Sequence, residues 1–302
     1  MSDYAPIILF VYARCDHTKK TIEALKKNTL ASKSDLFIFS DQHKNEQDVN
    51  NVSEVRNYIR HVEGFKTVTV IEREYNLGLA ENIRLGVSEI IEKYGRVIVL
   101  EDDIVTSNGF LTFMNKSLDI FKQNHKIWHI SGWNYPIDAT GLKSMFLWRG
   151  MNCWGWATWS DRWSHYNKNP QLLLSSWGRD KIKQFNLDGF FPFWNQVIAN
   201  EKGKINTWAI FWYATIFENN GLCINPTTTL VKNIGLDGTG ENCSSMSSFD
   251  KFDKRNECDV IFFEGYTENE IATNRIKEYC SSSRLSLVKK IKNKIIKKIK
   301  KM

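Results

Sequence analysis

Two hydrophobic periods alternate along the first hundred residues. Strand signals occupy residues 6–13, 35–41, 67–74 and 96–100, and the first of them is a continuous apolar run, as expected of a strand buried on both faces of a sheet. Segments with apolar residues three or four positions apart, which indicate amphipathic helices, follow the first three signals at residues 16–28, 48–62 and 79–95. Asp16 is placed to cap the first helix. This β-α-β-α-β-α-β order predicts an α/β fold: a parallel sheet with helices on both faces and a ligand crevice at the carboxyl ends of the strands.

The pattern changes after residue 131. The chain becomes irregular and aromatic, and it holds most of the 11 Trp residues of the sequence. Aromatic faces can stack on sugar rings or bases, although filling a core is the commoner role. Helical spacing returns at residues 191–201 and 208–218, and residues 233–242 form a polar loop with several glycines. We therefore divide the chain into residues 1–131, 132–283 and 284–302.

Polar side chains follow three of the predicted strands. Arg14 comes after the first strand, Asp41 after the second, and Glu101, Asp102 and Asp103 after the fourth. Because the carboxyl ends of parallel strands meet at one edge of the sheet, we expect these groups to line the crevice. In an extended segment Glu101 and Asp103 would point to one side and Asp102 to the other. The sequence contains neither G-x-G-x-x-G nor a P-loop, so it predicts no dinucleotide site of the Rossmann type.

The acidic triplet has two interpretations. Hard divalent cations such as Mn²⁺ or Mg²⁺ prefer carboxylate oxygens and keep positions open for substrate phosphate, where they neutralise the charge of a diphosphate leaving group. Alternatively, the triplet is an acidic turn that caps a helix starting near Gly109. Its place after the fourth strand, with Arg14 and Asp41 at neighbouring strand ends, favours the metal site.

The motifs together resemble a known family. The order FVYAR, FIFSD, NLGLAENI and VIVLEDD is similar to the nucleotide-sugar domain of GT-A glycosyltransferases, and E-D-D resembles the form that the D-x-D motif takes in the Golgi β-1,2-N-acetylglucosaminyltransferase. CWGWATW, from Cys153, and NIGLDGTG, from Asn233, resemble a bacterial branch used in surface-polysaccharide synthesis. The resemblance covers residues 6–243. It implies a GT-A fold whose nucleotide-sugar half is residues 1–131 and whose acceptor half is residues 132–283.

The resemblance implies roles at the nucleotide end of the crevice. Arg14 and Asp41 would hold the nucleotide, Asp41 through the uracil or the ribose. Asn76, Gly78 and Leu79 would shape the wall beside the nucleotide.

It also implies roles at the donor sugar. Asp102 would face the ribose or the sugar, and Asp103 would ligate Mn²⁺ or Mg²⁺, while Glu101 belongs to the donor site without an assigned role. Trp154 and Trp156 would be stacking surfaces beside the sugar, or else plain core tryptophans.

Arg84, on the helix between the third and fourth strands, has two equally good interpretations. It is either a phosphate ligand or a solvated surface arginine.

Two positions depart from the family. A His that is a common second metal ligand in the wider class is replaced by Asn242, whose amide oxygen is a weaker ligand for a hard cation. The acids that follow a Trp in the Golgi relative, and that supply its catalytic base, are replaced by Ala209 and Ile210. An inverting transferase needs such a base to take the proton of the acceptor hydroxyl. The substitutes that we consider are, in order, Asp237, Asp188 and Glu218.

Asp237 stands in the glycine loop, where Gly235 and Gly238 leave backbone room for a substrate. It fits equally well a turn residue that binds the amides of its own loop.

The net charge of +7 is concentrated in the tail. Residues 284–302 contain nine basic and no acidic residues, so residues 1–283 carry a net charge of −2 and offer no basic surface to nucleic acid. Apolar residues recur in the tail at intervals of three and four, which predicts an amphipathic cationic helix. We expect this helix to dock on an anionic membrane surface, where each lysine contributes about 1 kcal/mol. A solvated tail and a partner helix are the alternatives.

Several features bear on the compartment. The six cysteines are far apart and lack metal-binding spacing, so we interpret them as reduced thiols. The first apolar run is too short for a signal peptide, and no run reaches the ~20 apolar residues of a membrane span. We expect a cytoplasmic protein that is peripheral on the inner face of the cell membrane.

These features predict a metal-assisted, inverting glycosyltransferase. It would move a sugar from a nucleotide sugar, with UDP as the expected nucleotide, to a lipid-linked saccharide acceptor in bacterial surface-polysaccharide synthesis. One alternative is a nucleotidyltransferase, although the glycine-rich triphosphate loop of that class is absent. The other is a catalytically degenerate, membrane-associated module that binds a glycan or a partner, which Ala209, Ile210 and Asn242 would explain.

Overall fold

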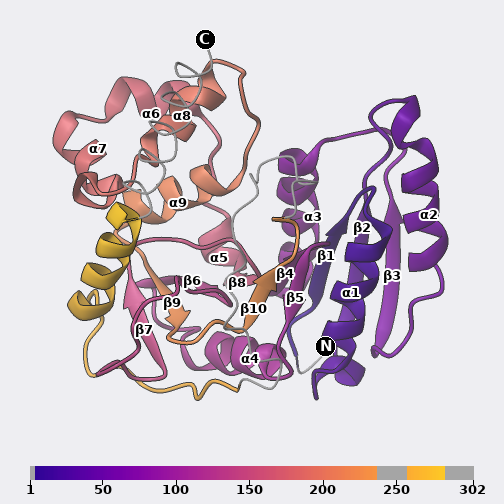
Figure 1. The fold of residues 1–302 in the computed structure, drawn as a ribbon, viewed down its shortest axis with the longest axis horizontal. Coiled ribbons are helices and arrows are strands. Elements are labelled where there is room, and N and C mark those ends of the chain that lie inside the picture. Colours follow the sequence, from indigo (N-terminus) through magenta and orange to yellow (C-terminus); the bar gives the residue numbers. More distant parts are fainter. Residues whose placement is uncertain (1–3, 237–256, 283–302) are drawn as a thin grey trace, which may run out of the picture.

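A computed structural model describes residues 4–236 and 257–282 (Figure 1). This part of the chain contains an eight-stranded sheet with the strand order β3-β2-β1-β4-β8-β6-β9-β7. The strands are β1 (Ile7–Val11), β2 (Asp35–Ser40), β3 (Thr67–Glu72), β4 (Arg96–Glu101), β6 (Ile127–Ser131), β7 (Met145–Trp148), β8 (Trp156–Trp159) and β9 (Leu222–Pro226). Strands β1 to β4 pair in parallel, and β8 joins β4 in the antiparallel direction. The sheet is therefore parallel where the sequence predicts it and mixed beyond β4.

Helices cover both faces of this sheet. They are α1 (Cys15–Lys26), α2 (Val49–Ile59), α3 (Leu79–Tyr94), α4 (Phe110–Ile120), α5 (Ser160–Trp163), α6 (Pro170–Ser176), α7 (Arg179–Phe185), α8 (Trp194–Glu201) and α9 (Ala209–Glu218). Short 3-10 turns are η1 (Ala31–Lys33), η2 (Glu46–Asp48) and η3 (Leu187–Gly189), and residues 270–282 are also helical. Helices α6, α7 and α8 lie together above α9, which lies between them and the mixed half of the sheet (Figure 1).

Strand β1 shows why the first apolar run is continuous. Ile7, Leu9 and Val11 belong to the core beneath α1, α2 and α4, whereas Ile8 and Phe10 belong to the core beneath α3. All five side chains are buried, because a central parallel strand has a helix layer on each side. The four strands and three helices expected in the first hundred residues are confirmed. Asp16 makes no capping hydrogen bond, however, since α1 begins one residue before it and Arg14 occupies the N-cap position.

The sheet crosses the expected boundary at residue 131. Strand β6 ends there, and β7, β8 and β9 continue the same sheet. The division into a nucleotide-sugar half and an acceptor half of one domain stays a prediction.

A second, two-stranded sheet lies beside the end of β4. Strand β5 (Ile104–Thr106) pairs in the antiparallel direction with β10 (Val231–Asn233), so that Asn233 is opposite Ile104. Helix α4 begins only after β5, with Gly109 as its N-cap and no acidic residue in its first turn. The interpretation of the acidic triplet as a helix cap is therefore wrong.

Membrane-spanning helices and the cysteines can be checked in the described residues. No helix within residues 4–236 and 257–282 is long and apolar enough to cross a membrane. The predicted amphipathic helix of residues 284–302 lies outside the described residues. Four of the described cysteines are free thiols, as expected: Cys15, Cys223, Cys258 and Cys280.

Candidate functional site

One guanidinium joins the ends of the two central strands. Strands β1 and β4 pair in parallel, with Phe10 opposite Glu101, so the residues that follow them meet at one edge of the sheet. Arg14 Nη2 contacts Asp102 Oδ1 and lies 2.8 Å from Asp103 Oδ2, while Arg14 Nε lies 3.4 Å from Asp102 Oδ2. The expected alternation of the triplet is therefore wrong: the chain turns after β4, and both aspartates face the same cation.

Ile234 and Gly235 lie against this cluster. The β5 and β10 pairing brings Ile234 beside Asp103, whose carbonyl oxygen accepts a hydrogen bond from Ile234 N at 2.9 Å. The next residue, Gly235, is so close that a methyl group on it would lie 2.1 Å from Asp103 Oδ2 and 2.7 Å from Arg14 Nη1. His17 on α1 reaches the same loop, with Nε2 3.3 Å from the carbonyl oxygen of Ile234. Two motifs that are more than a hundred residues apart thus form one site.

Burial and mutual repulsion control the charge of the triplet. Asp102 and Asp103 are buried and Glu101 is half-buried. Burial, reinforced by Asp103 and Asp102, raises the pKa of Glu101 to about 8. Burial also raises the pKa of Asp102 to about 6, although the neighbouring Arg14 opposes this shift. At neutral pH Glu101 is therefore mostly protonated, and the cluster carries less negative charge than three ionised carboxylates would.

The donor atoms of this cluster suit a hard divalent cation. Carboxylate oxygens are its preferred ligands, and Mg²⁺ and Mn²⁺ sites often use one or two of them and take the remaining ligands from phosphate and water. Among the described residues, Asp103 Oδ1 has no hydrogen-bond partner and Arg14 Nη1 is a buried donor without one. No group of three or more His, Cys, Asp or Glu side chains in residues 4–236 and 257–282 could hold a metal ion by itself. The cluster fits a metal that shares its coordination with a substrate.

Asp41 at the end of β2 has protein partners on both oxygens. Its Oδ1 accepts from the backbone N–H of Gln42 and of Leu77, each at 2.9 Å. Its Oδ2 accepts from the N–H of Gly78 at 2.8 Å and from Asn76 Nδ2 at 3.3 Å. The buried carboxylate thus holds the turn that leads into α3, where Gly78 has a φ of 72°. In this structure Asp41 shapes the wall at Asn76 and Gly78, and its contact with a nucleotide stays a prediction.

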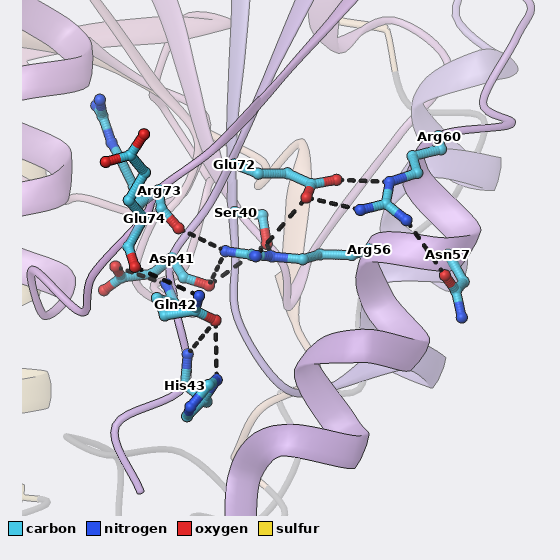
Figure 2. Close-up of polar contacts among 10 residues, drawn as sticks. All are labelled: Ser40, Asp41, Gln42, His43, Arg56, Asn57, Arg60, Glu72, Arg73 and Glu74. Carbon is cyan, nitrogen blue, oxygen red and sulfur yellow. Dashed lines mark hydrogen bonds and ion pairs between the residues drawn. The ribbon is translucent and has the colours of Figure 1, made fainter.

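Arg56 on α2 binds the chain at the ends of β2 and β3 (Figure 2). Its Nη2 donates to the carbonyl oxygen of Arg73 at 2.8 Å and to that of Asp41 at 3.3 Å, and its Nε donates to Ser40 Oγ at 3.3 Å. Glu72 lies 3.7 Å from Nη1 and also binds Arg60. The ends of β2 and β3 are therefore held together by one side chain. Sequence reasoning missed this role, since a single arginine on an amphipathic helix has no distinguishing pattern.

Two other donor-side positions lie on α3. Arg84 pairs with Glu81 one turn before it, with Nε 2.8 Å from Glu81 Oε2, and its side chain is 40% exposed. It therefore occupies the surface position that was one of its two interpretations. Leu79 is half-buried as the first residue of α3, next to Gly78.

The two tryptophans of the WGW motif have different surroundings. Trp156 is 1% exposed and lies between the rings of His129 and Trp208, at centroid distances of 5.5 and 5.1 Å. Both of its faces are covered, so its interpretation as a sugar-stacking surface is wrong. Trp154 is half-buried and packs edge to face on Trp133, at a centroid distance of 4.7 Å. Only Trp154 keeps the exposure that a stacking role requires.

The described candidates for the catalytic base are both bound to cations. Asp188 Oδ2 lies 2.6 Å from Arg149 Nη2 and 2.7 Å from Lys277 Nζ. Burial raises the pKa of Asp188, but these two cations outweigh it and the net pKa is lowered. Glu218 Oε1 accepts from Trp177 Nε1 at 2.7 Å and from Lys181 Nζ at 3.1 Å. The contacts of Asp188 do not favour proton uptake, and Glu218 Oε1 is held by two donors.

The other two sequence predictions, Asp237 as base and Asn242 as metal ligand, lie outside the described residues.

Comparisons with known proteins agree with the motifs. The model of the GNT-I family matches residues 1–186, and no curated protein matches the chain. Similar solved structures include the mannosyltransferase PcManGT from Pyrobaculum calidifontis in complex with GDP-Man and Mn²⁺, with 10% identity, a TM-score of 0.41, and coverage of 71% of this chain and 70% of that chain. An active-site mutant of LgtC has 9% identity and a TM-score of 0.37, and 70% of each chain is covered. TarS of S. aureus has 13% identity and a TM-score of 0.29, with 41% of this chain and 21% of that chain covered.

The family match includes Arg14, Asp41 and the whole acidic triplet, and it spans more than half of the chain. The chain therefore belongs to the GNT-I family of GT-A glycosyltransferases.

Proposed function

We propose that this glycosyltransferase uses a nucleoside diphosphate sugar, with UDP as the expected nucleotide, together with Mn²⁺ or Mg²⁺. The observation that carries the proposal is the meeting of Arg14, Asp102, Asp103 and Gly235 at the carboxyl ends of β1 and β4. Such a crevice is where α/β sheets bind their ligands. The cluster offers carboxylate oxygens for a cation and an unused guanidinium N–H for an anion, which are the two partners that a metal-bound diphosphate requires.

Each residue has a distinct part in this proposal. Asp103 would hold the metal, which when bound neutralises the charge that grows on the departing diphosphate. Arg14 would donate hydrogen bonds to the diphosphate, and Asp102 would accept from the ribose or the donor sugar. Asp41 would position the wall at Asn76 through its contacts with the turn before α3.

The proposal extends to the acceptor side. An inverting transfer requires a base on the acceptor side of the sugar. Among the sequence candidates, Asp237 is the base that we propose, since Asp188 and Glu218 are engaged by cations. We propose a saccharide acceptor, lipid-linked and part of a bacterial surface polysaccharide.

Docking of residues 284–302 on the inner membrane surface belongs to the same proposal. A variant without residues 285–302 should move from the membrane pellet to the supernatant, and continued pelleting would contradict the docking.

Thermal shift measurements test the donor site. Wild type should be stabilised by one of UDP, GDP and CDP, and only when Mn²⁺ is present. Asp103→Ala should abolish this stabilisation, because the shared metal would lose its protein ligand. Asp180→Ala is the matched control, since Asp180 is an exposed residue in the first turn of α7. If none of the three diphosphates raised the Tm of the wild type, with or without Mn²⁺, the proposal would be contradicted. That result would favour a catalytically degenerate module.

A further inference from the structure

Arg14 contacts both of the aspartates that could bind a metal ion. A single nitrogen, Nη2, contacts Asp102 Oδ1 and Asp103 Oδ2, so one cation serves both aspartates. The side chain of Arg14 is 22% exposed, and those of Asp102 and Asp103 are 6% and 10% exposed. Water therefore screens these contacts poorly, and a second cation at Asp103 would face a like charge at short range. We therefore expect the guanidinium and a metal ion to compete for Asp103 Oδ2.

The charges of the cluster are not balanced by Arg14 alone. Asp102 and Asp103 carry two negative charges when ionised, and Arg14 carries one positive charge. A divalent cation could neutralise the charge that is left, but the guanidinium would then repel it. A diphosphate resolves this conflict, because its anionic oxygens can accept hydrogen bonds from the guanidinium while they share the metal.

The guanidinium already has an unused donor. Arg14 Nη1 is buried and has no hydrogen-bond partner in the described part of the chain. Buried donors are nearly always paired, because an unpaired one costs free energy. Gly235 lies directly over this nitrogen, and its lack of a side chain leaves the approach free of a methyl group that would stand 2.7 Å away. Arg14 is therefore bound to the aspartates through Nη2, while its Nη1 donor has no hydrogen-bond partner in the described part of the chain.

We propose that Arg14 is an exchangeable internal cation: it neutralises Asp102 and Asp103 in the unliganded protein and passes to the diphosphate when a divalent metal ion takes its place. This inference rests on the proposed function, and it adds a coupling between two ligands of that site. Because the diphosphate draws Arg14 away from Asp103, it should strengthen metal binding. By linkage, the metal must strengthen diphosphate binding by the same factor.

Electron paramagnetic resonance of unbound Mn²⁺ tests the exchange. In wild type, 1 equivalent of UDP, after subtraction of the Mn²⁺ bound by UDP alone, should raise the affinity for Mn²⁺ by about tenfold or more. Arg14→Met should bind Mn²⁺ about tenfold more tightly than wild type without UDP, and UDP should then add less than about threefold. Arg60→Met is the matched control, since Arg60 is half exposed and pairs with Glu72 away from the triplet. GDP replaces UDP if GDP gives the larger thermal shift.

The outcomes separate the exchange from the proposed function. Equal Mn²⁺ affinity in wild type and Arg14→Met, with diphosphate binding intact, overturns the exchange and leaves the function standing. The absence of Mn²⁺ and diphosphate binding from both proteins overturns the function, and the exchange with it.

A second measurement covers the case in which Arg14→Met does not fold. In wild type labelled with ¹⁵N-arginine, the Nε–H signal of Arg14 should shift when UDP and Mg²⁺ are added together. An unchanged signal in a protein that binds UDP overturns the exchange.

Discussion

Trp212 donates its indole N–H to Nδ1 of His129 at 3.2 Å. Because an indole nitrogen can only donate, Nδ1 is unprotonated, and the proton on Nε2 points to the carbonyl oxygen of Asn152 at 3.0 Å. The ring of His129 also stacks on Trp156. A neutral histidine therefore ties β6 to α9 and to the loop that carries the WGW motif.

Acid should weaken the fold through this histidine. Burial lowers the pKa of His129 from 6.5 to about 3, so between these values the unfolded chain binds a proton that the folded chain does not. Stability is thus intact above the unfolded pKa and is lost as the pH falls. From pH 6.5 to pH 5 the loss from this group should be about 2 kcal/mol. Urea unfolding at several pH values measures it.

His129→Phe isolates the contribution of the imidazole. The variant keeps a ring beside Trp156 but leaves two buried groups unpaired, each at a cost of about 1–3 kcal/mol at pH 7. Its stability should depend less on pH than that of wild type. His61→Phe, at an exposed position, should keep the wild-type dependence. Parallel pH curves for wild type and His129→Phe would contradict the assignment.

A methyl group at Gly235 should disable the donor site. Gly235→Ala places a carbon 2.1 Å from Asp103 Oδ2, so the carboxylate or the loop must move. We expect the Mn²⁺-dependent stabilisation by the diphosphate to disappear in a thermal shift assay. Gly178→Ala is the control, because nothing lies within 4 Å of the added methyl group there. A full diphosphate response in Gly235→Ala would show that the loop does not need this close approach.

Loss of Arg56 should destabilise the chain at the ends of β2 and β3, beside the proposed nucleotide site. Arg56→Met removes the donor shared by the ends of β2 and β3, which should lower the free energy of unfolding by about 1–3 kcal/mol. It should also weaken diphosphate binding, measured by calorimetry, because the chain at Asp41 is less well held. Arg60→Met removes a half-exposed ion pair, which solvent screens, and should lower the free energy of unfolding less than Arg56→Met does. Equal effects of the two changes would rule out a special role for Arg56.

Asp188→Asn decides between a base and a structural ion pair. Arg149 and Lys277 lower the pKa of Asp188 although burial raises it, which makes the carboxylate a weak base at neutral pH. We expect a small fall in Tm and a transfer rate within about tenfold of wild type, since loss of a general base costs about 10²–10⁴-fold. A hundredfold loss of rate with an unchanged Tm would restore Asp188 as the base.

The predictable part of the fold is the part with local signals. Strand β1 lies within the apolar run of residues 6–13 because a strand buried on both faces has no polar position to interrupt it. The pair of β5 and β10 has no such signal, since each strand has three residues and their partner is distant in sequence. The same holds for the site. The sequence identifies its polar groups because each of them follows a predicted strand: Arg14, Asp41 and the triplet.

The role of each of these groups depends on the side chains and backbone that pack around it, and a local sequence pattern does not show these neighbours. Trp154 and Trp156 are two residues apart in one motif, yet only Trp156 is enclosed by other rings. The sequence suggests that Asp41 binds a nucleotide, but in the structure its carboxylate accepts hydrogen bonds from the backbone N–H groups of Leu77 and Gly78. These differences arise from segments that are distant in the chain, so no local pattern reveals them.

The pairing of β5 with β10 also sets the order in which the site is built. The family match ends at residue 186, but the strand that closes the loop over Asp103 begins at Val231. A growing chain can form β1 to β4 early, because their contacts follow one another in sequence, whereas β5 must wait for more than a hundred further residues. The acidic triplet thus gains the close approach of Gly235 late in biosynthesis, after the sheet that carries it.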